Sequence, residues 1–205
     1  MPTRSHPFGL VIATLVVATV VTGCSATSST SSVESPDTSI AVSSPPPSTP
    51  AGRVASDYRR LLIEPGDINN GTDTFATRSS TTNPGGSDGV AALLVNQHDT
   101  RAIGDTILIL PDSAAATTTL DTTVSSLGTI VTGGSPQPSP VGTGGTVVSG
   151  TSPDGSKAVT VLLFTEGRAV VRLEFGSAPG DPMPPQVVTD VGKQQQIAVR
   201  TGLPG

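Results

Sequence analysis

Aromatic residues and cysteine are nearly absent from this chain. Aromatic side chains make up 2% of the sequence, tryptophan does not occur, and Cys24 is the only cysteine. The stacking platforms that bind bases or sugars are therefore almost missing, and no disulfide can form within the chain. A folded core must be built from Val, Leu, Ile and Ala.

Clustered positive charge is also lacking. Lys and Arg number 11 against 16 Asp and Glu, and the formal net charge is −5. Nucleic acids and anionic lipid surfaces select clustered positive side chains, so we expect no nucleic-acid partner. The chain has one cysteine and two histidines, and no calcium-loop spacing of acidic residues occurs. We therefore expect neither a metal ion nor a cofactor.

The first 23 residues have the pattern of a signal peptide. Arg4 precedes an apolar run from Phe8 to Val21. That run of about 14 residues is shorter than the ~20 that span a bilayer, and it suits the core of a signal peptide. It closes with Val21, Thr22, Gly23 and Cys24. An aliphatic residue, two small residues and a cysteine resemble the lipobox of bacterial lipoproteins.

The lipobox resemblance implies a lipid anchor at Cys24. In that family a diacylglyceryl group is transferred to the cysteine sulfur, the peptide is cleaved after Gly23, and the new amino terminus is often acylated with a fatty acid such as palmitate. Each buried methylene contributes about 0.8 kcal/mol, so two or three chains hold a protein almost permanently. We expect an extracytoplasmic protein anchored to the cell membrane; the alternative is an uncleaved membrane anchor that ends in cysteine.

The next segment, residues 24–52, is predicted to be a disordered tether. Ser25 to Gly52 consists almost entirely of Ser, Thr, Pro and Ala, with three consecutive prolines from Pro45 to Pro47. Such a composition cannot bury enough apolar surface to offset the entropy of ordering. A coil of this length spans roughly 30 Å, so it acts as a spacer between the lipid and the folded domain.

Residues 53–205 are predicted to form a single α+β domain. Apolar periodicity indicates helices over residues 55–62, from Asp112 as N-cap to residue 127, and from Pro184-Pro185 onward. Five strands are expected over residues 90–96, 102–110, 146–151, 158–165 and 169–175. Residues 64–89 are expected to be a loop with one helical turn at Pro65-Gly66-Asp67. The order is α-β-β-α-β-β-β-α, and hairpin connections predict a mainly antiparallel sheet covered by helices.

This order, together with the lipobox and tether, resembles small mycobacterial and related actinobacterial lipoproteins. Some of those are similar to the extracellular sensor domains of receptor-type serine/threonine kinases, and others to Mog1/PsbP-like sandwiches. The resemblance covers the architecture from Arg53 to Gly205. This chain lacks the disulfide cysteines of the kinase sensors. The resemblance implies a sensing or binding role in the cell envelope.

One motif offers a catalytic alternative. Gly85-Gly86-Ser87-Asp88-Gly89 fits the G-x-S-x-G pattern of hydrolases, and His98 would be the base, oriented by Asp99 or Asp105. The hydrolase motif requires a strand before the serine and a helix after it, whereas here a predicted strand follows. A glycine-rich loop, with His98 in a hairpin turn, is the simpler interpretation.

We therefore expect a noncatalytic, lipid-anchored ligand-binding or sensor-like domain. The ligand classes left open are an amphipathic small molecule, an envelope glycolipid and another protein. The alternative is an extracytoplasmic serine hydrolase that uses Ser87 and His98. A third possibility is an envelope accessory protein without a small ligand. The sequence sets no oligomeric state.

Overall fold

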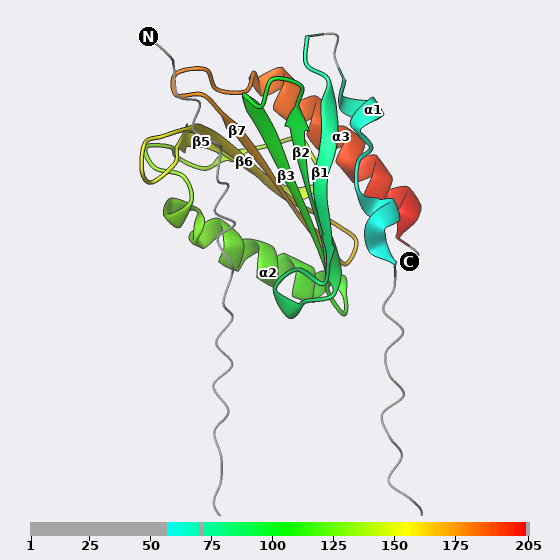
Figure 1. Cartoon of the computed structure of the whole chain (residues 1–205). Helices are drawn as coiled ribbons and strands as arrows, with labels where there is room; N and C mark the ends of the chain where they lie inside the picture. The colour runs from blue at the N-terminus through cyan, green and yellow to red at the C-terminus, as the bar shows by residue number, and fades with distance from the viewer. Residues whose placement is uncertain (1–56, 70–71, 204–205) are drawn as a thin grey trace, which may run out of the picture. The chain divides into compact units, whose positions relative to one another are not determined.

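A computed structural model of the chain describes residues 57–69 and 72–203. The predicted signal peptide, Cys24 and the predicted tether lie outside these residues. Within them the chain forms seven strands in one sheet, three α-helices and three short 3-10 turns (Figure 1). The expected α+β class with an antiparallel sheet is confirmed.

The elements follow one another as a 3-10 turn, a short helix, three strands, a helix, four strands and a final helix. The helices are α1 (Pro65–Ile68), α2 (Ser113–Ser125) and α3 (Pro185–Gly202). The strands are β1 (Phe75–Thr82), β2 (Gly89–Asn96), β3 (Arg101–Ile109), β4 (Gln137–Pro138), β5 (Thr143–Thr151), β6 (Ala158–Glu166) and β7 (Ala169–Ser177). The 3-10 turns are η1 (Tyr58–Leu61), η2 (Pro84–Gly86) and η3 (Leu127–Thr129).

The sheet has the strand order β1-β2-β3-β7-β6-β5-β4, and every neighbouring pair is antiparallel. Helix α3 lies against one face of the sheet and α2 against the other, so the domain has three layers (Figure 1). Successive side chains along a strand point to opposite faces. We call these the α3 face and the α2 face.

The α3 face carries the larger hydrophobic core. Leu162, Phe164, Leu173 and Phe175 of the central strands are at most 1% exposed, and they pack in one cluster with apolar residues of α3. A segment that we call the N-terminal strap, residues 57–63, closes this core. Its buried side chains are Tyr58, Leu61 and Ile63.

The α2 face carries a smaller core. Leu120 of α2 and Leu127 pack against Val159, Val161 and Leu163 of β6. The Asp112 side chain caps α2 by accepting a hydrogen bond from the Ala115 N–H at 2.8 Å, as predicted. Several threonines of α2 bond back to carbonyls one turn earlier, which slightly weakens a helix. Packing against β6 therefore stabilises α2 more than intrinsic propensity does.

The expected helical turn at Pro65 is confirmed as α1, whereas the expected loop over the rest of residues 64–89 is wrong in part, because it contains β1 and η2. Only Phe75 of β1 is buried, so the strand has no apolar alternation by which the sequence could reveal it. The two-residue strand β4 was likewise missed. The first expected helix is a 3-10 turn in its described part, and α2 ends at Ser125, two residues before the expected residue 127.

Candidate functional site

The structure does not bring Ser87 and His98 together. Ser87 precedes β2 and His98 lies in the turn that follows it, and a strand of eight residues spans about 25 Å. Ser87 follows a 3-10 turn rather than a strand, and both side chains are exposed. The geometry of a serine hydrolase is therefore absent at this pair.

The glycines of the G-x-S-x-G motif have a structural role. Gly85 and Gly86 adopt positive φ values of 61° and 81° in the turn before β2. A Cβ atom at Gly89 would lie 2.1 Å from the backbone oxygen of Ile107 on β3. Glycine is required where a backbone turns left-handed or another backbone approaches this closely. The motif is thus explained by the β1–β2 connection and the β2–β3 contact.

The two proposed orienting acids lie apart from each other. Asp99 occupies the β2–β3 turn and forms an exposed ion pair with Arg78 of β1. Asp105 lies in the middle of β3, where it is 0% exposed. Its partners in neighbouring strands are Ala92 and Leu173, so it faces the α3 core rather than the histidine.

A polar cluster that sequence reasoning missed ties three segments at one end of the sheet. Asp73 accepts hydrogen bonds from Asn96 at 2.7 Å and from Arg101 at 3.2 Å. Arg101 also pairs with Asp181, in the β7–α3 connection, at 3.1 Å. Asn96 in turn accepts from the backbone N–H groups of Thr100 and Arg101. These groups satisfy one another, so the cluster holds the β2–β3 turn in place rather than presenting reactive atoms.

The most distinctive surface is an uncovered part of the α2 face. Helix α2 makes its main contacts with β5, β6 and β7. On β2 and β3, beyond its reach, five apolar side chains of the α2 face are only half-buried: Ala91, Leu93, Val95, Ala102 and Leu108. Within the described residues, none of the five belongs to either hydrophobic core. We call these five residues the open face.

A charged pair separates the open face from the part of the sheet under α2. Arg172 and Glu174 project from β7 on the α2 face, and their side chains meet at 2.7 Å. They are 24% and 29% exposed. The expected alternation along β7 is confirmed, because Val171, Leu173 and Phe175 are buried on the other face. The ion pair thus marks the border of the helix cover.

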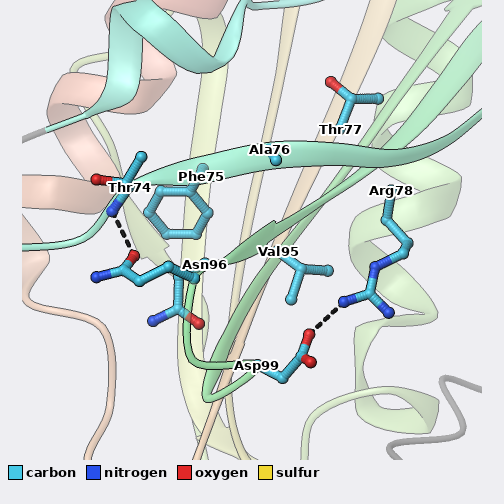
Figure 2. Close-up of a pocket in the computed structure, with 9 residues that line it drawn as sticks. Thr74, Phe75, Ala76, Thr77, Arg78, Val95, Asn96 and Asp99 are labelled. Atoms are coloured by element: carbon cyan, nitrogen blue, oxygen red, sulfur yellow. Dashed lines mark hydrogen bonds and ion pairs between the residues drawn. The ribbon is translucent and has the colours of Figure 1, made fainter.

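A hollow lies at the outer end of the open face. It has a volume of about 410 Å³ and is lined by residues 74–78 of the β1 segment and by Val95, Asn96, Gln97 and Asp99. Figure 2 shows Arg78 and Asp99 pointing toward each other beside Val95. The hollow therefore combines an apolar wall with a pair of exposed opposite charges.

Asp105 has the most perturbed carboxyl group of the described residues. Burial raises its pKa to about 8, because a charged carboxylate is costly inside an apolar core; the nearby Ile63 N–H opposes this only in part. That N–H donates to Gln195 Oε1 at 3.1 Å. The Ile63 N–H does not have hydrogen-bonding geometry toward Asp105, and neither carboxyl oxygen of Asp105 has a hydrogen-bond partner.

No group of three or more His, Cys, Asp or Glu side chains that could hold a metal ion occurs in residues 57–69 and 72–203. In the same residues, no helix is both long and apolar enough to cross a membrane. Comparisons with family models, curated proteins and solved structures found no match to this chain.

Proposed function

We propose that this chain is a cell-envelope lipoprotein, anchored outside the membrane through Cys24, whose folded domain is a noncatalytic binding module. The open face is the binding surface in this proposal. The ligand is an amphipathic component of the envelope, either a lipid or a protein. The lipobox sequence supports the anchor, and the uncovered apolar side chains support the binding role.

One observation carries the binding role. An antiparallel sheet can leave one face to water where that face is polar, but here apolar side chains lie beyond β5, β6 and β7, the strands with which α2 makes its main contacts. Leu93, Val95 and Leu108 are left half-buried on the same side. Contiguous apolar surface that stays in contact with water commonly marks an interaction site. An apolar part of a ligand laid on the open face would remove that surface from water at about 25 cal/mol for each Å².

The neighbouring charges suit an amphipathic ligand. Arg78 and Asp99, at the hollow, are 58% and 59% exposed. Polar groups at the rim of an apolar surface orient a ligand and keep its polar end in water. We therefore place the apolar part of the ligand on the open face and its polar end at the hollow.

The test compares two aspartate substitutions. The chain from residue 53 onward is titrated with palmitoyl lysophosphatidylcholine, whose zwitterionic headgroup suits the Arg78–Asp99 pair, and binding is read as an increase in unfolding free energy. Saturable binding adds about 2.7 kcal/mol when the free ligand is at one hundred times its dissociation constant. Leu93→Asp places a charge on the open face and should abolish this gain. Thr118→Asp, on the exposed side of α2, is the matched control and should leave it unchanged.

A second experiment distinguishes lipid from protein. A photo-crosslinking side chain at position 93 in cells should form an adduct whose mass identifies a lipid or a polypeptide. Absence of any adduct, together with lysolipid binding that Leu93→Asp does not affect, would exclude the open face. An ester-cleaving activity lost in both Ser87→Ala and His98→Ala would instead support the hydrolase.

A further inference from the structure

The buried carboxyl of Asp105 lies close to the backbone of the N-terminal strap. Asp105 is 0% exposed, and neither of its oxygens makes a hydrogen bond. Buried polar side chains without partners are rare in folded proteins, and each requires an explanation. The donor that acts on this carboxyl is the backbone N–H of Ile63, the last residue of the N-terminal strap.

The strap is attached to α3 through one buried side chain. Gln195, also 0% exposed, donates to the Leu61 carbonyl at 2.7 Å and accepts from the Ile63 N–H at 3.1 Å. Arg60 adds a hydrogen bond to the Gly202 carbonyl at 2.9 Å. Because the strap pairs with no strand, it can leave without breaking the β2–β3 or β3–β7 ladders.

No charged group among the described residues faces Asp105. Its strand neighbours are apolar, and the ion pair of β7 lies on the opposite face of the sheet. Arg101, on the same strand and face, is four residues or about 13 Å away and is paired with Asp73 and Asp181. The remaining charged side chains of the strap, α1 and α3 are exposed: Asp57, Arg59, Arg60, Glu64, Asp67, Asp190, Lys193 and Arg200. An ionised Asp105 would therefore have no compensating charge.

We propose that Asp105 is a proton-dependent lock on the N-terminal strap. While the carboxyl keeps its proton, the strap stays packed on α3; loss of the proton releases the strap and lengthens the tether. Release frees the seven residues 57–63, about 23 Å of extended chain. Under the proposed anchor at Cys24, on which this consequence rests, the distance that the domain can reach from the membrane then depends on pH. This proposal does not depend on what the open face binds.

The direction of the pH dependence follows from the number of protons bound with the strap closed and open. With the strap closed, Asp105 keeps its proton up to about pH 8. With the strap open, its carboxyl meets water and loses the proton near the ordinary value of about 4. Between these values opening releases one proton, so each pH unit favours the open form by up to tenfold. The strap is locked in acid and loosens progressively as the pH rises from 4 to 8.

Amide hydrogen exchange on the full chain in detergent tests the lock between pH 5 and pH 8. After correction for the intrinsic exchange rate, the opening constant of the Leu62 and Ile63 amides should rise by up to tenfold per pH unit. The opening constant should not change with pH in Asp105→Asn. Asp105→Leu should behave in the same way and replaces Asp105→Asn as the test variant if that variant folds poorly. Asp121→Asn, an exposed carboxylate on α2, is the matched control and should keep the parent slope.

Two further readouts separate the lock from general unfolding. The strap amides should open at least tenfold more often than the Leu162 amide in the central strand β6. Gln195→Leu should raise strap opening at every pH without changing its slope, because it removes the attachment and keeps the titrating group. Opening that is independent of pH in the parent, a slope that persists in both Asp105 variants, or strap exchange only through global unfolding would each overturn the proposal.

Discussion

Three positions on one face of the sheet test how far the cover of α2 extends. Leu163 of β6 and Arg172 of β7 are direct cross-strand partners on the α2 face, and Leu93 lies on the same face two strands further out. Leu163 is 0% exposed under α2. The other two side chains are only half-buried. The three substitutions Leu163→Asp, Arg172→Ala and Leu93→Asp should therefore differ widely in cost.

The magnitudes follow from burial. Truncation of a buried leucine costs about 2–5 kcal/mol, and an unpaired buried carboxyl adds several more. Leu163→Asp should thus lose at least about 5 kcal/mol, a large part of the stability of a typical domain. Arg172→Ala removes one partly exposed ion pair, which is worth about 0–1 kcal/mol. Leu93→Asp should cost about 1 kcal/mol, because its carboxylate stays in contact with water.

Urea unfolding followed by circular dichroism measures these differences. With a slope of about 2 kcal/mol per molar urea, Leu163→Asp should lower the midpoint by about 2.5 M or leave the chain unfolded. Leu163→Met, a change of similar volume, is the control and should cost less than about 1.5 kcal/mol. Equal midpoints for Leu163→Asp and Arg172→Ala would refute the assignment of the α2 face. A Leu93→Asp loss as large as that of Leu163→Asp would show that the open face is covered.

Three other outcomes are expected. In the parent chain, the unfolding free energy should fall by up to about 1.4 kcal/mol per pH unit between pH 5 and 8, and Asp105→Asn should remove this fall. Parallel curves of unfolding free energy against pH for parent and variant would contradict the burial of that carboxyl. Cys24→Ser should block both lipid labelling and signal cleavage, and normal labelling of the serine variant would rule out the lipoprotein assignment. Removal of Ser25–Gly52 should leave the melting temperature unchanged, whereas a large decrease would show that this segment packs on the domain.

Much of the fold could be predicted from local patterns. The β2–β3 and β6–β7 hairpins, the Asp112 cap and the opening of α3 at Pro184-Pro185 each follow from apolar periodicity, turn residues or capping chemistry within a few positions. Strand β1 could not be found this way. A Ser- and Thr-rich edge strand buries one residue of eight and carries no apolar alternation.

The candidate site depended on tertiary structure throughout. Nothing local shows that Leu93 and Val95 lie beyond the reach of α2, because their alternation is the same as that of a covered strand. The environment of Asp105 is likewise not visible in the local sequence. The sequence places it in an apolar strand, but its lack of a partner depends on Gln195 and Ile63, which are 90 and 42 positions away in the chain.

The sequence by itself carries the lipobox pattern on which the proposed export and lipidation rest, the low-complexity segment and the α+β class, because these depend on composition and on periodicity over short windows. Tertiary structure alone decided that Ser87 and His98 are held apart, that the part of the α2 face on β2 and β3 is open, and that Asp105 is enclosed in the core near the strap. The physical reason is that burial and pairing are properties of surfaces assembled from distant segments. A residue's neighbours along the chain do not specify which segment will cover it.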